Sequence, residues 1–197
     1  MESVRLSAPL LPISSKRILH IGRLVKWKRV DLLIDALPIL LKSFPDAELV
    51  IVGDGPELDN LKAQSAELKL NEHIRFVGSV YSPKELGAYM NESTVYVLAG
   101  MGGLSINDAM TYRLPVICSV CDSTERDLVI EGKNGFFFKE GNAVSLAEKI
   151  KKLFSTPGLS EAMGEESERI ITEKINLETV SELYLEAFRL SRIHFSE

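Results

Sequence analysis

The sequence predicts an α/β domain, and three observations carry that prediction. Short, almost continuous apolar runs recur along the chain, at residues 17–21, 48–52, 74–77, 94–98 and 114–118. Segments whose apolar residues repeat at helical spacing separate these runs. A glycine follows four of the five runs, directly or two residues later. Strands that are apolar on both faces are typical of a parallel sheet buried between two layers of helices, so a three-layer arrangement is expected.

The helical segments are recognised by their periodicity and by their end signals. The first, at about 29–43, has apolar residues at Val30, Leu33, Ile34, Leu37, Leu40 and Leu41. The third opens with Ser82-Pro83-Lys84-Glu85, a capping box with proline at the first helical position. The remaining helices are expected at 57–68, directly after Gly103, at 122–130, around 147–154, at 160–172 and at 177–193. A turn at 132–135 precedes the aromatic run 136–138, which is typical of an edge strand.

Composition narrows the class of protein. The chain has 197 residues, 45 % hydrophobic and 26 % charged, so it is long enough to bury a core of its own. A net charge of -5 without a long basic run argues against a nucleic-acid partner. Cys118 and Cys121 form a single Cys-x-x-Cys and the three histidines show no ligand spacing, so neither a metal nor another cofactor is predicted. Two cysteines, no signal peptide and no apolar run of about 18 residues predict a cytoplasmic protein.

The stretch VLAGMGGLSINDAM, residues 97–110, is the strongest candidate for a ligand site. It joins an apolar strand to a helix start through Gly100, Gly102 and Gly103. Glycine lets a ligand approach the backbone closely, and the free N–H groups at a helix start attract anions, so a phosphate is the expected ligand. Glycine-rich turns of this kind also occur as packing features, and the stretch alone leaves that alternative open.

A second candidate lies at the same edge of the predicted sheet. Parallel strands bring their carboxyl ends, and the turns that follow them, to one edge, where open α/β sheets bind ligands. The turn after the first strand, GRLVKWK at 22–28, places Arg23 and Lys28 there. Arginine offers a planar fork and lysine a mobile point charge for phosphate oxygens. Four glycine turns and this cation pair at one edge favour a ligand site over a set of solvated loops.

Several motifs together resemble the donor-binding half of the family 4 retaining glycosyltransferases, which have the GT-B fold. They are IGRLVKWKRVDLLIDAL (21–37), ELVIVGDGPE (48–57), IRFVGSV followed by SPKEL (74–86), GLSINDAM with LPVICS (103–119) and EGKNGFFF (131–138), in the order seen in that family. The likeness covers about residues 16–154. It implies a Rossmann-like three-layer domain, one half of a GT-B enzyme, that binds a nucleotide-diphosphate sugar.

The resemblance also implies roles for individual residues. Arg23 and Lys28 would hold the donor diphosphate, and Val80 would pack near the nucleobase. The other expected substrate-binding residues lie in the glycine turns and at the helix start; they are Gly22, Gly53, Gly102, Gly103, Leu104, Ser105 and Asp108. No catalytic residue is assigned in this half, and the family's retaining reaction needs no metal.

The sequence departs from the family pattern at several positions. The family usually has two glutamates separated by seven residues, the first near the donor sugar and the second on the ribose hydroxyls; here these positions are Gly100 and Asp108. Asp108 keeps a carboxylate that can accept hydrogen bonds, whereas Gly100 has no side chain to do so. Arg113 stands where a glycine is usual, and Asp122-Ser123 replaces a common glycine pair. The identity of the donor therefore stays open.

We expect residues 1–15 to be a linker or a truncated end, 16–158 the nucleotide-sugar-binding domain, and 159–197 helices that contact an acceptor-binding domain preceding this chain. The expected function is retaining transfer of a sugar from the nucleotide donor to a saccharide or lipid-linked acceptor in polysaccharide or glycolipid assembly. The isolated domain is expected to be inactive, and the full-length protein could associate peripherally with the inner face of the membrane.

Two alternatives stay open. One is a non-catalytic nucleotide-sugar-binding or interaction module, which is motivated by Gly100. The other is a GT-B epimerase acting on nucleotide sugars, for which no motif here supplies the catalytic carboxylates and histidines.

Overall fold

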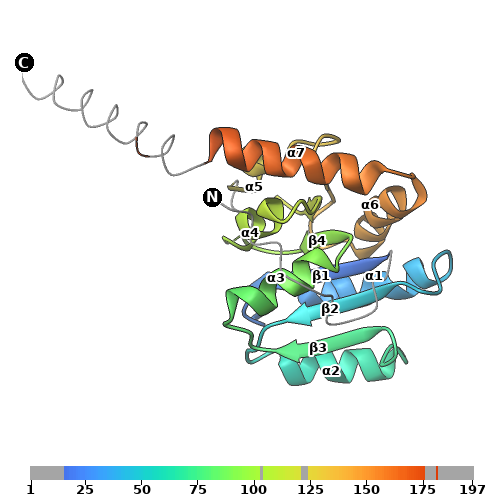
Figure 1. Ribbon diagram of the computed structural model, residues 1–197. Helices are drawn as coiled ribbons and strands as arrows, with labels where there is room; N and C mark the ends of the chain where they lie inside the picture. Colours follow the sequence, from blue (N-terminus) through green and yellow to red (C-terminus); the bar gives the residue numbers. More distant parts are fainter. Residues whose placement is uncertain (1–15, 103, 121–123, 176–180, 182–197) are drawn as a thin grey trace, which may run out of the picture.

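The structure is a computed structural model that describes residues 16–102, 104–120, 124–175 and 181 (Figure 1). It contains a six-stranded sheet with helices on both faces. The predicted linker at 1–15 and the predicted helix at 177–193, apart from Ser181, lie outside the described residues.

All six strands are parallel and follow the order β3-β2-β1-β4-β5-β6. Their bounds are β1 Arg17–Ile21, β2 Glu48–Val52, β3 Ile74–Gly78, β4 Val95–Leu98, β5 Val116–Cys118 and β6 Gly135–Phe137. The sheet grows outward from β1 on one side and from β4 on the other, so the chain reverses its direction of winding between these two strands. This reversal is where open α/β sheets bind ligands. The predicted fold class, a Rossmann-like parallel sheet, is confirmed.

Seven α-helices are described, together with the short 3-10 helix η1 at Lys26–Lys28; they are α1 Val30–Leu41, α2 Leu58–Glu67, α3 Pro83–Asn91, α4 Ser105–Thr111, α5 Thr124–Leu128, α6 Ala143–Ser155 and α7 Leu159–Lys174. Side chains of the central strands alternate between two apolar layers. Ile18 and Leu49 face the layer built with α1 and α6, whereas Leu19 and Val50 face the layer built with α4. The central strands are therefore buried on both faces, as their continuous apolar runs predict.

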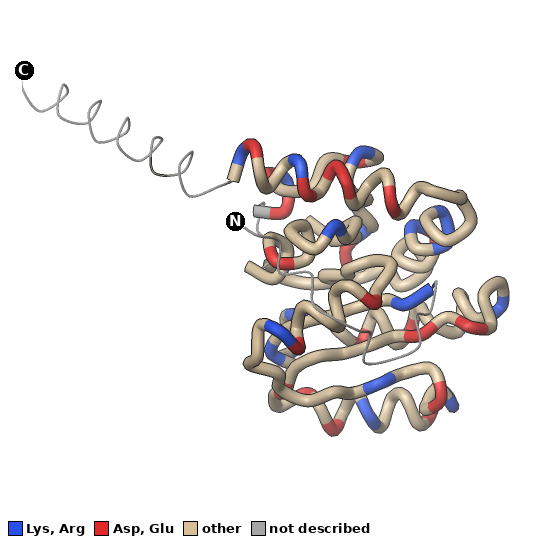
Figure 2. The backbone as a smooth tube through the Cα atoms, viewed as in Figure 1, with Lys and Arg blue, Asp and Glu red and all other residues tan. Residues whose placement is uncertain are grey.

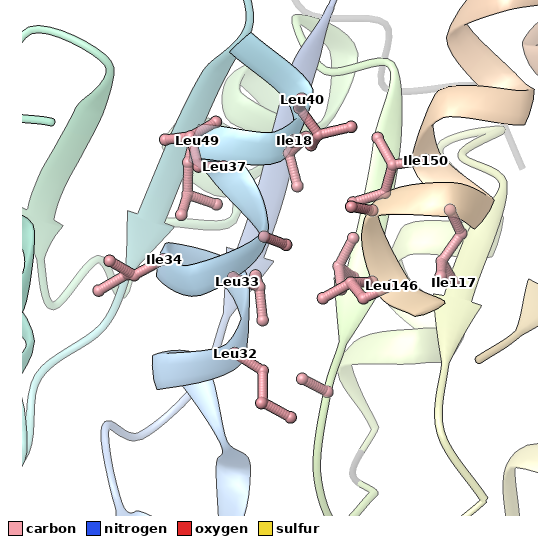
Figure 3. Packing of buried hydrophobic residues seen from close by; sticks show 14 of the residues in the cluster. Ile18, Leu32, Leu33, Ile34, Leu37, Leu40, Leu49, Ile117, Leu146 and Ile150 are labelled. Atoms are coloured by element: carbon pink, nitrogen blue, oxygen red, sulfur yellow. The ribbon is translucent and has the colours of Figure 1, made fainter. Parts of the chain in front are cut away.

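Helix α1 shows how the periodic pattern becomes packing. Leu33, Leu37 and Leu40 lie on one face of this helix and are almost inaccessible to solvent. Leu146 and Ile150 of α6 belong to the same cluster, and Figure 3 shows them beside α1 over the sheet. These two helices form the outer layer on this side of the sheet together with α2, whose Leu61 belongs to the same cluster.

The predicted element ends agree with the structure to within a few residues, and one difference has a clear cause. The strand predicted at 114–118 begins at Val116, because Pro115 has no N–H to donate and the Leu114 N–H donates to the Ala109 carbonyl at 3.0 Å, which ends α4. The N-cap hydrogen bond of the predicted capping box is present, since Ser82 Oγ accepts the Glu85 N–H at 3.4 Å. The aromatic run forms β6, an edge strand, as predicted.

Charged residues of both signs occur along α7, as the colours of Figure 2 show, and most of them are acidic. Arg169 forms ion pairs with Glu166 and Glu173 within this helix. Arg113, in the connection between α4 and β5, reaches Glu168 across the α4–α7 contact. Exposed pairs of this kind contribute little to stability, so the packing of α7 rests mainly on its buried residues, which include Met163 and Ile170.

Candidate functional site

A pocket of about 630 Å³ opens at the carboxyl edge of the sheet, where β1, β2 and β3 end. It brings together four of the predicted site residues, Gly22, Arg23, Gly53 and Val80. The other residues that line it are Ile21, Val52, Asp54, Gly55, Ser79 and Tyr81. Parallel pairing is the reason for this convergence, because residues that follow three different strands meet at one edge.

Glycine backbone forms part of the pocket lining. Gly22 donates its N–H to the Val52 carbonyl at 3.0 Å, and Gly53 donates to the Gly78 carbonyl at 2.8 Å, so the ladder continues past the strand ends. Gly53 has a φ of 142°, and a Cβ there would lie 1.9 Å from the Gly22 carbonyl oxygen. Only glycine fits at Gly53, and the close approach of the two loops leaves the pocket lined by main chain at this point.

Lys28 joins the β1–α1 loop to the β4–α4 loop. Its ammonium group donates to the Met101 carbonyl oxygen at 2.8 Å and also to the Gly102 carbonyl oxygen. The Met101 N–H in turn donates to the Trp27 carbonyl at 3.0 Å. The predicted diphosphate lysine and the predicted glycine stretch are thus in direct contact.

The predicted residues consequently form two groups at the same edge. Gly22, Arg23, Gly53 and Val80 line the pocket, and Lys28 lies beside Gly102 in the adjoining loops. Leu104, Ser105 and Asp108 belong to the start of α4, where the Leu104 carbonyl accepts the N–H groups of residues 107 and 108. Gly103, which was also predicted, lies outside the described residues.

Tyr96 ties the start of α4 to the end of β1. Its hydroxyl lies 2.7 Å from Ser105 Oγ and 3.2 Å from the Ile21 carbonyl oxygen. Burial raises the pKa of Tyr96, so this hydroxyl stays protonated and can donate a hydrogen bond over the whole physiological range. The tyrosine therefore positions Ser105, the first residue of α4, relative to the pocket.

Tyr96→Phe is expected to lower the free energy of unfolding by about 1 kcal/mol, because it removes the hydroxyl and leaves the ring packing intact. Urea unfolding of Tyr96→Phe, Ser105→Ala and the double variant forms a double-mutant cycle. The two single effects should sum to more than the effect of the double variant. Strict additivity would show that the hydrogen bond between the two hydroxyls contributes nothing.

Asp108 occupies the position where the resemblance predicts a ribose contact. It is the acidic residue in the first turn of α4, and the residue is in part open to solvent. Partial burial raises the pKa of its carboxyl group. The carboxylate can accept hydrogen bonds from hydroxyl groups, as a ribose contact would require.

Two residues at this edge were missed by reasoning from the sequence. His20 and Tyr96 sit inside apolar strand runs, where they read as core residues, and both are fully buried. Their polar atoms nevertheless lie against the loops of the candidate site. The one sequence signal was position, since His20 stands two residues before Gly22 and Tyr96 four residues before Gly100.

The described part of the chain contains neither a metal-type cluster nor a membrane-type helix. Within the ranges that the structure describes, no three side chains of the types His, Cys, Asp and Glu are grouped so that they could hold a metal ion. Cys121, one half of the Cys-x-x-Cys, lies outside those ranges. None of the described helices is long and apolar enough to cross a membrane.

Sequence comparison relates the chain to glycosyltransferases. The profile of the family "Glycosyl transferases group 1" matches residues 8–170. A phosphatidyl-myo-inositol mannosyltransferase from Mycobacterium leprae is 33 % identical over 163 residues, which are 79 % of this chain and 42 % of that protein. The chain spans 36–49 % of the length of the first curated relatives it matches.

Structure comparison agrees. The C-terminal domain of LpcC, a glycosyl transferase group 1 family protein from Francisella tularensis, matches with a TM-score of 0.75 at 24 % identity, over 82 % of this chain and 87 % of that one. A TarM variant from S. aureus, crystallised with fondaparinux, alpha-GlcNAc-glycerol and UDP, matches with a TM-score of 0.82 at 24 % identity, over 93 % of this chain and 37 % of that one. At such identities the likeness establishes the fold.

Proposed function

Because the chain belongs to the group 1 glycosyl transferases and has the fold of one half of a GT-B enzyme, we propose that it binds the nucleotide-diphosphate sugar donor of a retaining sugar transfer. Residues 16–158 would form the donor domain, and 159–197 would contact an acceptor-binding domain. The acceptor would be a saccharide or a lipid-linked saccharide. The observation that carries the proposal is the pocket at the carboxyl ends of β1, β2 and β3, next to the strand-order reversal, with Arg23 in its lining and Lys28 in the adjoining loop.

The chemistry of the pocket suits a nucleoside diphosphate. Val80 and Tyr81 provide an apolar and an aromatic surface for the base, while the glycine backbone leaves room for the ribose. Arg23 can contact two phosphate oxygens at once through its guanidinium group. These groups would meet the charge of the leaving nucleotide during transfer.

Lys28 would bring the second loop into the same site. Its ammonium group already contacts the carbonyls of Met101 and Gly102. Exchange of one carbonyl for a phosphate oxygen would couple diphosphate binding to the position of the β4–α4 loop. The known relatives lend support, since TarM was crystallised with UDP and the Mycobacterium leprae relative is named for mannosyl transfer.

Arg23→Ala and Lys28→Ala are each expected to weaken binding of nucleoside diphosphates about tenfold or more, which corresponds to roughly 1.4 kcal/mol. Calorimetric titration of the whole chain with UDP and with GDP measures this effect and identifies the base. Lys26→Ala is the matched control, because Lys26 lies in the same loop, is exposed and is absent from the pocket lining. Its affinity should equal that of the parent protein.

Two results would contradict the proposal. One is the absence of binding to any nucleoside diphosphate at millimolar concentration. The other is an equal loss of affinity in the Lys26→Ala control, which would indicate a general effect of positive charge rather than a built diphosphate site.

Gly100 supports a second candidate, a domain that binds nucleotide sugars without transferring them. The position where the family usually places a sugar-binding glutamate has no side chain here, and the neighbouring loop leaves no room for one. Turnover separates the two candidates. Acceptor-dependent release of free nucleotide by the full-length protein, lost in Arg23→Ala and Lys28→Ala, would favour the enzyme; binding without release would favour the module.

A further inference from the structure

His20 has a buried ring nitrogen, Nε2, to which the proposed function assigns no role. The side chain is fully buried in β1, and Nδ1 lies 3.0 Å from the Val97 carbonyl oxygen of β4. Because a carbonyl oxygen only accepts hydrogen bonds, Nδ1 carries the proton and Nε2 carries the lone pair. Among the residues that the structure describes, none forms a hydrogen bond with Nε2. A buried polar atom of this kind is costly to the fold and calls for an explanation.

The unpartnered nitrogen lies behind the candidate diphosphate site. Nε2 is 3.5 Å from the point that a Cβ on Gly22 would occupy, so the ring rests against the backbone of a residue that lines the pocket. Gly22 leads directly to Arg23. Apart from the chain neighbours of Gly22, no other atom of the described residues lies within 4 Å of that point, so the imidazole faces glycine main chain there.

The charged and titratable groups that act on His20 come from two elements. Lys28, from η1, disfavours the protonated ring, and Tyr96, from β4, lies parallel to it at 6.5 Å between ring centroids and is neutral. The neighbour in β2 is Ile51, which is apolar. Burial is the main reason why the pKa of His20 falls to about 4, and the charge of Lys28 adds to it. At neutral pH the ring is therefore uncharged.

We propose that His20 takes up one proton from solvent when a diphosphate binds against Arg23 and Lys28, and that the resulting imidazolium helps to hold the anion. This inference rests on the proposed function. Phosphate charge would offset the repulsion from Lys28 and attract the imidazolium, and both effects favour protonation. The Nδ1 hydrogen bond to Val97 is the same in both forms, so the ring need not move.

Linkage fixes the sign of the effect. If binding of a ligand raises the pKa of a group, the ligand binds more tightly at a pH where that group is protonated in the complex. Donor affinity should therefore increase as the pH falls toward the raised pKa of His20, and should level off at higher pH. The converse also holds, since the ligand must raise the pKa of His20.

The test uses UDP-glucose, or GDP-mannose if guanine is the preferred base. Their diphosphate is a diester and lacks the titration near pH 6 that a terminal phosphate shows. Calorimetry of the whole chain at about pH 5.5, in buffers of different ionisation enthalpy, counts the protons taken up on binding. We expect uptake approaching about one proton, and affinity about tenfold higher than at about pH 8.

His20→Asn is the matched variant. Its side-chain amide can still donate to Val97, but it has no counterpart of Nε2 and does not titrate. Proton uptake should disappear and the affinity should become nearly independent of pH. Asp108, whose pKa is raised by burial, is present in both proteins, so their difference isolates His20.

The outcomes separate the inference from the function on which it rests. Equal proton uptake by the parent protein and His20→Asn would overturn the role of His20 while leaving donor binding intact. Failure of the parent protein to bind at millimolar concentration at either pH would contradict the donor site itself. If His20→Asn does not fold, the imidazole NMR titration of the parent protein decides, because the pKa of His20 must rise when the nucleotide sugar is added.

Discussion

Gly100→Ala is expected to abolish nucleotide binding and to lower the free energy of unfolding by more than about 3 kcal/mol. A Cβ at this position would lie 2.0 Å from the carbonyl oxygen of Trp27 and 2.7 Å from the carbonyl carbon of Lys28. Both are backbone atoms, so no side-chain rotation relieves the clash. The two loops would have to separate, which breaks the hydrogen bond from Met101 to Trp27 and displaces Lys28.

The control is a glycine with an equally severe clash away from the pocket. A Cβ on Gly164, in α7, would lie 2.0 Å from the Arg113 carbonyl oxygen, at the other end of α4. Urea unfolding followed by circular dichroism should show lower stability for both variants. In calorimetry, folded Gly100→Ala should no longer bind nucleotide, whereas folded Gly164→Ala should still bind it. A Gly100→Ala protein as stable as the parent protein would show that the loops are not packed as described.

The same contact concerns the position at which the resemblance predicts a glutamate and this chain has Gly100. No residue with a Cβ fits between the β1–α1 and β4–α4 loops as they are packed here, and a glutamate is larger still. The missing carboxylate is therefore part of the way the two loops meet. If a donor sugar binds at this edge, its hydroxyl groups have to be held by other atoms.

The second large effect is expected from Glu92→Ala, at the amino edge of the sheet. Arg17 donates from Nε to Glu48 at 2.8 Å and from Nη1 to Glu92 at 2.9 Å, and the Arg17 and Glu92 side chains are each 3 % exposed. Removing Glu92 leaves a buried guanidinium whose carboxylate partner Glu48 is partly exposed to water. The loss should be about 3 kcal/mol in urea unfolding, because a buried charge loses a partner that offset its desolvation.

Asp46→Ala is the control that shows how much of the Glu92→Ala effect depends on burial of the Arg17–Glu92 ion pair. Lys16 and Asp46 form an ion pair at the same edge, but Asp46 is 57 % exposed, so the expected loss is below about 1 kcal/mol. Replacing Arg17 and Glu92 together by methionine should recover most of the stability lost in Glu92→Ala, because both charges leave the interior. A Glu92→Ala protein no less stable than Asp46→Ala would contradict this account.

The elements were predictable because their signals are local. The runs at 17–21 and 48–52 are apolar at most of the positions that the two helical layers bury, with Arg17 and His20 as the buried polar exceptions, and both strands have these bounds in the structure. The start of β5 was predicted too early. Leu114 is apolar and belongs to the run. Its N–H, however, forms a hydrogen bond at the end of α4, and no local sequence pattern predicts this bond.

The candidate site was predictable to the extent that it follows strand ends. Gly22, Arg23, Gly53 and Val80 each follow a strand, and parallel pairing alone brings them to one pocket. The roles proposed for them in donor binding stay predictions. The contact of Lys28 with the glycine loop depends on how two loops far apart in the sequence pack. The sequence therefore predicted the edge of the sheet at which Lys28 lies, but not the carbonyl groups that it contacts.

The order of apolar runs, helical periods and glycine turns by itself determined that this chain is a parallel α/β domain. It also determined at which edge of the sheet the residues typical of phosphate sites lie. These properties depend on spacing along the chain. Only the tertiary structure decided that Gly100 must lack a side chain, that Tyr96 holds Ser105, and that the lone pair of His20 lies behind Gly22. Gly100 contacts Trp27, Tyr96 also contacts Ile21, and His20 contacts Val97, so each feature involves segments about 75 residues apart that meet only when the sheet forms.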